Sequence, residues 1–287
     1  MTNECNKPGW WIVAGDKWVS SIFVGASGVP MHEIVAVINT GPRSYDGTAK
    51  ITTPDALRDF LTRAPEFPLF CKLNDGKWSV GASTITGADA THIHLKGRAP
   101  IIYANFFADQ IGKDVFLIQK FVSNHSFLQN YTPTTATVRM VNMWTDKGLW
   151  TPHAILKRPS AQNDADNFWR PGNLVCQLDE VTGEILTVVG KDGPDLIRHE
   201  THPETGTAVL GLRLPHWDAL LDLNARFAAQ HAAVSYSTQD IAITQDGPVL
   251  IECNWGGSFE LPQIATGRGF MTPEVRAFFR SIGSKWV

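Results

Sequence analysis

The stretch that decides the fold runs from Asp240 to Asn254 and reads DIAITQDGPVLIECN. Apolar and polar residues alternate on both sides of Gln245-Asp246-Gly247, and this pattern predicts two antiparallel strands joined by a turn. Opposite residues of such a pair share a face, and the apolar residues of both strands must lie on the same face. Ile241 is therefore expected to pair with Ile251. That register requires a three-residue loop with Gly247 in the left-handed conformation.

The predicted register has a chemical consequence. It places Asp240 opposite Glu252, with Asn254 two residues further along the same face. Two carboxylates that lie directly opposite repel each other, and a divalent cation would turn that repulsion into a binding site. Carboxylate and amide oxygens suit Mg²⁺ that is shared with phosphate oxygens. The alternative is a solvated polar face on an ordinary hairpin.

A second candidate is Lys72, at the end of a predicted strand over 68–72. It precedes the glycine-containing loop 74–81, and residues 78–82 are expected to form a return strand after the turn at 74–76. Backbone N–H groups of such a loop can cover phosphates, and Lys72 would add a positive charge. The alternative is a surface hairpin with an ordinary Asn-Asp-Gly turn.

A third candidate is the segment 116–122, where an apolar strand is interrupted by Gln119-Lys120 and continues with Phe121-Val122. A purine ring needs backbone hydrogen bonds at its edge and apolar contacts on its faces, and this segment can supply both. A strand that simply leaves the core is the alternative.

The fourth candidate is a set of cations on neighbouring predicted strands: Arg139, and Lys157 followed by Arg158. Fixed cations facing one cleft would stabilise a transferring phosphoryl group. Surface charges paired with nearby acids are the alternative.

Composition bounds the class of protein. The 287 residues predict about two domains at roughly 150 residues each. With 25 Lys plus Arg, 28 Asp plus Glu and a net charge of −3, no nucleic-acid partner is expected. The sequence contains no run of about 18 apolar residues, so no membrane-spanning helix is expected. The four cysteines are widely spaced, which favours free thiols in a reducing cytoplasm.

Strands that outnumber helices and occur in hairpins predict an α+β fold with antiparallel sheets. Helices are expected from Asp16 to Ser27, over 54–63, over 215–231 and over 273–281. Strands are expected over 114–122, 135–144, 151–158, 174–178 and 185–189.

The order of these features resembles the ATP-grasp superfamily. A narrower resemblance, to the sugar-transfer-associated ATP-grasp proteins, rests on Arg139 in TVRMV, Arg158, the Asp166-Asn167-Phe168 run, the HPETG run from His202 and the hairpin above. The resemblance implies two α+β lobes that grip ATP. The expected lobes are 1–118, with the glycine-rich lid loop, and 119–287, with the hinge and the magnesium site.

The resemblance also implies roles for individual residues. Arg139, Arg158 and Lys72 would be catalytic, and Mg²⁺ would be held by Asp240, Glu252 and Asn254. The nucleotide would be bound by Lys17, Lys72, Asn74, Ser79, Gly81, Gln119, Lys120, Phe121, Val122, His125 and Asn167.

Departures from the family pattern are visible. Gln119 replaces the commoner hinge acid, Ser126 falls where a ribose-binding acid often sits, with His125 as a substitute, and Thr238 replaces an arginine. Only about 15 residues precede Asp16, so the usual N-terminal domain, roughly a hundred residues long, is expected to be missing. The acceptor site would then be open, or completed by a homodimer or a partner protein.

The expected activity is ATP-dependent ligation of a carboxylate to an amine through an acyl phosphate, with release of ADP and phosphate. The substrates would be small, sugar- or amino-acid-derived molecules of a natural-product or glycan-related pathway. The alternatives are a small-molecule kinase and a non-catalytic nucleotide-binding accessory protein.

Overall fold

The computed structural model describes residues 2–63, 66–285 and 287. The chain folds into two compact units, which we call unit 1 (Met1–Met31 and Ser123–Val287) and unit 2 (His32–Val122). Val13, Val24 and Val29 pack into the core of unit 1. For this reason the division differs from the expected one, 1–118 and 119–287, which kept the first residues with the N-terminal lobe.

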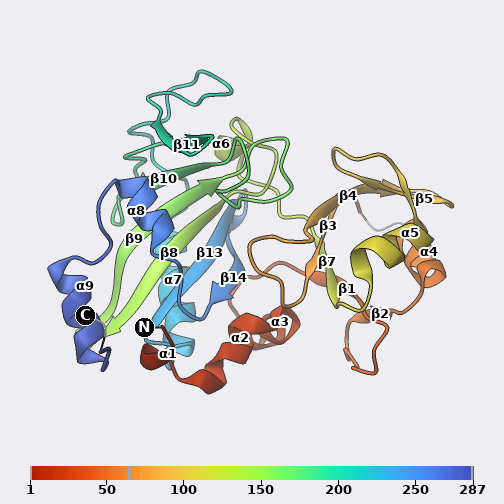
Figure 1. The fold of residues 1–287 in the computed structure, drawn as a ribbon, viewed down its shortest axis with the longest axis horizontal. Helices are drawn as coiled ribbons and strands as arrows, with labels where there is room; N and C mark the ends of the chain where they lie inside the picture. Colours follow the sequence, from red (N-terminus) through yellow and green to blue (C-terminus); the bar gives the residue numbers. More distant parts are fainter. Residues whose placement is uncertain (1, 64–65, 286) are drawn as a thin grey trace. The chain divides into compact units, whose positions relative to one another are not determined.

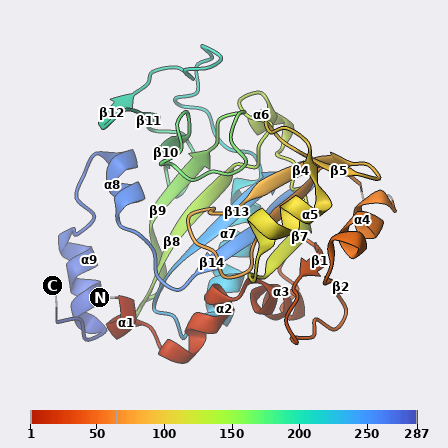
Figure 2. The same ribbon diagram turned by 45° about the vertical axis from the view of Figure 1, so that its right-hand side comes forward.

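Unit 1 is built on one large sheet, whose described strands follow the order β12-β11-β10-β9-β8-β13-β14 (Figure 1; β12 is labelled in Figure 2). Every neighbouring pair in it is antiparallel. Its strands are β8 (Thr137–Thr145), β9 (Gly148–Arg158), β10 (Leu174–Leu178), β11 (Val189–Asp192), β12 (Asp195–Arg198), β13 (Tyr236–Thr244) and β14 (Gly247–Asn254). Its helices are α1 (Thr2–Cys5), a 3₁₀ turn η1 (Pro8–Trp10), α2 (Trp11–Gly15), α3 (Lys17–Ala26), α6 (Ser126–Gln129), α7 (Trp217–Gln230), α8 (Glu260–Thr266) and α9 (Pro273–Ser281).

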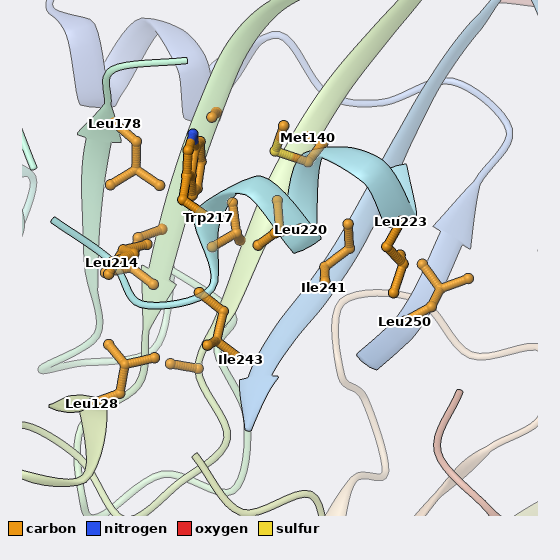
Figure 3. Packing of buried hydrophobic residues seen from close by; sticks show 14 of the residues in the cluster. Leu128, Met140, Leu178, Leu214, Trp217, Leu220, Leu223, Ile241, Ile243 and Leu250 are labelled. Atoms are coloured by element: carbon orange, nitrogen blue, oxygen red, sulfur yellow. The ribbon is translucent and has the colours of Figure 1, made fainter. Parts of the chain in front are cut away.

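The apolar core of unit 1 lies on one face of this sheet, which we call the core face. Helix α7 covers it, and Figure 3 shows Trp217 and Leu220 of α7 together with Met140 and Ile241 of the strands. The opposite face packs in part against α8, where Ile155 and Leu261 belong to a smaller apolar cluster. This opposite face carries the charged residues discussed below.

Capping residues explain where several helices begin. Asp16 accepts a hydrogen bond from the Val19 N–H at the start of α3, and Gly28 follows that helix with a φ of 69°. Thr53 and Thr272 cap the two helices that begin with a proline. These helices, and α7, confirm the predicted ones within a few residues.

Unit 2 contains a second sheet with the order β2-β1-β7-β3-β4-β5-β6 over the described residues, and α4 and α5 cover one of its faces (Figure 2). Only the edge pair β1–β2 is parallel among the pairs that the structure describes. Its elements are β1 (Ile34–Ile38), β2 (Ala49–Ile51), α4 (Pro54–Thr62), β3 (Leu69–Leu73), β4 (Ser83–Ala88), β5 (His92–Leu95), β6 (Ile101–Ile102), α5 (Tyr103–Phe106), a π-helical turn η2 (Phe107–Ile111) and β7 (Phe116–Lys120).

The two mixed units confirm the predicted α+β class with sheets that are mainly antiparallel. Among the helices of residues 2–63 and 66–285, none combines the length and the hydropathy needed to cross a bilayer.

Candidate active site

The β13–β14 hairpin brings the two predicted acids together. Asp240 on β13 pairs directly with Glu252 on β14, as the sequence predicts. Asn254 lies two residues beyond Glu252, and therefore on the same face of the sheet. This face is the one opposite the core face, because Ile241, the neighbour of Asp240, is in the core.

The loop length and the pairing near the turn of this hairpin differ from the expected ones. Thr244 pairs with Gly247, so the loop holds two residues and not three. Ile241 pairs with Leu250, and Ile251 is an extra residue in a β-bulge beside Glu252. The predicted pairing of Ile241 with Ile251 is therefore wrong, and the tight loop plus the bulge produce the same opposition of the acids.

Asp240 is buried and held by two cations. Arg139 on β8 donates from Nε to Oδ1 at 2.8 Å and from Nη2 to Oδ2 at 2.7 Å. Lys157 on β9 donates to Oδ2 at 3.0 Å. Burial alone would raise the pKa of Asp240, but the charges and hydrogen bonds of Arg139 and Lys157 outweigh it and hold that pKa well below its usual range.

The charged cluster continues on both sides of Asp240. Lys157 also lies 3.1 Å from a carboxylate oxygen of Asp166, and Glu252 lies 3.6 Å from the buried ammonium of Lys17 at the start of α3. Acids and cations thus alternate along this face. Lys157 was among the cations expected to face the cleft, but neither Lys157 nor Asp166 had been predicted as a catalytic, nucleotide or metal ligand.

Arg158 does not join Arg139. In the register of β8 and β9, Arg139 pairs with Ile155, so Lys157 shares its face and Arg158 points to the core face. There Arg158 donates to a Glu204 carboxylate oxygen at 2.7 Å and to the carbonyl of Tyr131. The expectation that Arg139 and Arg158 face one cleft is therefore wrong, and Lys157 takes that position.

Two further predicted nucleotide ligands of unit 1 have local roles. The Asn167 side chain accepts a hydrogen bond from the Trp169 N–H at 3.1 Å, directly after Asp166. His125 accepts one from the Phe127 N–H through Nδ1 at 3.0 Å, at the start of α6. Asn167 is thus adjacent in sequence to the charged cluster, whereas His125 stands at the beginning of a short helix.

Unit 2 brings Lys72 and Gln119 to the same face of its sheet. Phe70 pairs with Gln119 across β3 and β7, and Lys72 lies two residues beyond Phe70. Both polar side chains are buried, and the Gln119 amide contacts His32. The next residue, Lys120, is exposed and lies 2.6 Å from Glu33. Phe121 and Val122 follow β7 and are half-buried.

The loop after Lys72 is a compact turn. Residues 78–82 do not form the predicted return strand, which begins only at Ser83. Trp78, Ser79 and Gly81 all have positive φ, at 56°, 57° and 72°, and backbone bonds close the turn at Val80. Strand residues have negative φ, and three of the four residues 78–81 have positive φ. The predicted return strand over 78–82 therefore cannot form. At the start of the loop, Asn74 is buried and its N–H donates to the Val115 carbonyl at 2.8 Å.

The donor set fits a magnesium ion. Three hydrogen bonds occupy three of the roughly four acceptor positions of the Asp240 carboxylate, leaving one at Oδ1. Glu252 is partly exposed, and the buried Asn254 Nδ2 atom has no hydrogen-bond partner. Turning that amide by 180° would present an oxygen instead. The candidate donors are therefore two carboxylates and one amide. Among the described residues, no group of three or more His, Cys, Asp or Glu side chains is placed to hold a metal ion.

A site in which carboxylates lie beside fixed cations has the chemistry to hold a metal ion and phosphate oxygens together. The family model described as sugar-transfer associated ATP-grasp matches residues 71–278. The chain belongs to this family, and its fold is the ATP-grasp fold. The resemblance noted in the sequence is confirmed.

Several solved structures are similar at low identity. D-alanine–D-alanine ligase from Helicobacter pylori has a TM-score of 0.49 and 12% identity, over 94% of this chain and 58% of that one. N5-carboxyaminoimidazole ribonucleotide synthetase from Thermotoga maritima has a TM-score of 0.47 and 11% identity, over 96% and 50%. The chain thus spans about half to three fifths of these two proteins. Among curated protein sequences, none matches this chain significantly.

Proposed function

We propose that this protein is an ATP-dependent ligase that joins a carboxylate to an amine. In the first step a carboxylate oxygen attacks the γ-phosphorus of ATP, the bond to the β–γ bridging oxygen breaks, and ADP leaves. In the second step the amine nitrogen attacks the acyl carbon of the acyl phosphate, loses a proton and displaces phosphate. Such chemistry depends on positioning and on charge neutralisation.

The observation that carries this proposal is the opposition of Asp240 and Glu252, with Arg139 bonded to Asp240 and Lys157 held between Asp240 and Asp166. Membership of the ATP-grasp family supports ATP as the nucleotide. A face with both acids and fixed cations can bind a metal ion and phosphate oxygens at the same time, whereas a purely basic face would bind phosphate alone.

We assign roles within unit 1 from the positions of the side chains. Arg139 and Lys157 would stabilise negative charge on the transferring phosphoryl group, and they keep Asp240 ionised. Lys17, next to Glu252, would bind a phosphate oxygen. Asp166 orients Lys157 from its other side, at 3.1 Å.

In unit 2, Lys72 would contact a phosphate oxygen, and the backbone of the turn that contains Ser79 and Gly81 would cover the phosphates. Gln119 would accept or donate at the adenine edge together with the backbone of Lys120 and Phe121. Lys72 and Gln119 share one face of the sheet, which supports a common ligand.

Glu252, Asn254 and the remaining position on Asp240 would hold Mg²⁺. The bound ion would neutralise phosphate charge and lower the barrier to phosphoryl transfer.

The experiment that tests the proposal compares Glu252→Gln with the exposed control Glu200→Gln. ADP release is measured with a coupled assay over a panel of amino acids and sugar acids as carboxylates, with amines added. We expect substrate-dependent ADP release by the wild type and by Glu200→Gln, and a loss of about a hundredfold or more in Glu252→Gln. Circular dichroism establishes that Glu252→Gln is folded. Full activity in that variant would overturn the assignment.

Hydroxylamine distinguishes the proposed ligase from a kinase that phosphorylates a hydroxyl. An acyl phosphate reacts with hydroxylamine to give a hydroxamate, whereas a phosphate ester does not. Hydroxamate formation that depends on ATP and on the carboxylate is the expected result. ADP release with a phosphorylated alcohol as product would contradict the ligase proposal.

A further inference from the structure

A second polar cluster lies at the end of β9, on the core face and away from Asp240. Arg158, Ser160 and His202 are all buried there, with 3%, 4% and 2% of their surfaces exposed. Glu204 bridges two of them, because one carboxylate oxygen accepts from Arg158 at 2.7 Å and the other from Ser160 at 2.8 Å.

The polar groups around this cluster have their hydrogen bonds. The Asn173 amide accepts from the Ser160 N–H and donates to the carbonyls of Ala165 and Asn167. The Asn124 amide likewise bonds to three backbone groups of the neighbouring loop. The surroundings are therefore a well-formed polar layer and not a loosely packed region.

Three donors stand out against this background. Arg158 Nε, Arg158 Nη1 and His202 Nε2 are buried and have no hydrogen-bond partner. Leaving one buried donor without a partner costs about 1–3 kcal/mol, and more for a charged group, so native proteins rarely leave such donors unbonded.

The unpartnered Nε2 atom of His202 is a hydrogen-bond donor. Its Nδ1 accepts a hydrogen bond from the Thr205 N–H at 3.2 Å, so the ring proton lies on Nε2. Burial, and then the charge of Arg158, lower the pKa of His202 to about 4, which keeps the ring neutral. The three unpartnered atoms of the cluster are therefore all N–H donors, and they require a ligand that accepts hydrogen bonds.

The charge of Arg158 favours an anion. Its side chain is almost fully buried, and its ion partner Glu204 has a side chain that is 38% exposed. Burial lowers the pKa of Arg158 more than the hydrogen bond and charge of Glu204 raise it, so a further negative group would stabilise the charged guanidinium.

We propose that Arg158 and His202 form a second ligand site, which binds a small oxyanion such as a carboxylate or a phosphate group. This site lies on the sheet face opposite to Asp240 and is separate from the proposed site of phosphoryl transfer. The ligand would enter past the turn at residues 203–206, which is exposed and closes on itself through the Gly206 N–H and the His202 carbonyl at 2.7 Å.

The test titrates phosphate and acetate, in separate arms, into protein saturated with ADP and Mg²⁺. Binding is followed by calorimetry and by the ¹⁵N resonances of the histidine rings. We expect saturable binding of at least one anion, with a shift at His202 Nε2. The arm that responds identifies whether carboxylate or phosphate is preferred.

Three variants decide the assignment. His202→Phe removes one donor and preserves the ring volume, so affinity is expected to fall by about tenfold, or 1.4 kcal/mol. Arg158→Met is expected to abolish binding, and the exposed control Arg213→Gln to leave it unchanged. Failure of both anions to saturate would overturn the proposal, as would unchanged affinity in a folded His202→Phe variant. Neither result bears on Glu252 or on ADP release, so the ligase proposal is tested independently.

Discussion

Arg139 clamps Asp240 with two parallel hydrogen bonds, 2.8 and 2.7 Å long, from a neighbouring strand of the same sheet. The paired positions on β8 and β13 place the two side chains directly across from each other. In the family pattern described under Sequence analysis, an arginine lies two residues before the first metal-binding acid. This chain has Thr238 at that position. Arg139 supplies a fixed positive charge beside that acid from β8 instead.

Removing Arg139 is expected to destabilise the fold, because it leaves a buried carboxylate with Lys157 as its remaining cation. We expect Arg139→Met to lower the free energy of unfolding by about 3 kcal/mol, as measured by urea denaturation. The double variant Arg139→Met/Asp240→Asn should regain part of that loss, since the uncompensated charge is gone. Additive losses in the double variant would show that the two residues are not coupled.

Lys157 provides the sharpest test of the revised site. We expect Lys157→Met to lower kcat for ADP release by about a hundredfold, because it removes a fixed cation that binds both Asp240 and Asp166. Lys147→Met, in the exposed turn between β8 and β9, is the matched control. A small effect on kcat with a large effect on KM would assign Lys157 to ground-state binding and contradict the role in phosphoryl transfer.

The sequence predicts the pairing of Asp240 with Glu252, but it selects Arg158 and not Lys157 as the second catalytic cation. A register shift between β8 and β9 accounts for that error. The tight turn after Thr145 would place Arg158 on the face of Arg139 if the pairing continued regularly. The register shifts by one residue between Val141 and Met143, opposite Pro152, and a one-residue shift exchanges the two faces of a strand. Pro152 within a predicted strand is the signal that could have indicated the bulge.

Helix starts were predictable because caps are local. Asp16, Thr53 and Thr272 each bond to a backbone N–H three residues further on, and this depends on nothing outside the segment. The turn at Trp78 and Ser79 was not predictable, since neither residue type favours a positive φ. The assignment of the first 31 residues to unit 1 depends on long-range packing, which local patterns do not contain.

Ser79 offers a test of the turn conformation. At a φ of 57° a β-branched residue is strained, whereas glycine adopts this conformation freely. We expect Ser79→Gly to be more stable than Ser79→Val by about 1–2 kcal/mol in urea denaturation. Equal stability of the two variants would contradict the left-handed geometry at this position.

His231 should make the protein sensitive to acid. Its ring is buried against Trp10, Phe23 and Phe227, and neither ring nitrogen has a hydrogen-bond partner. Burial lowers the pKa of His231 to about 4, from an ordinary value of 6.5. Between these values the unfolded chain binds a proton that the folded chain does not, so the free energy of unfolding falls as the pH drops from about 6.5 to about 4.

The variant His231→Phe isolates this contribution, because phenylalanine has a similar shape, suits an aromatic environment and does not titrate. We expect the wild type to lose about 2 kcal/mol more stability than His231→Phe between pH 7.5 and pH 5, from denaturation curves at both values. His202, whose pKa is also lowered to about 4, remains in both proteins, so its effect cancels in the comparison. Parallel losses in the two proteins would mean that His231 is protonated in the folded state, which its apolar surroundings oppose.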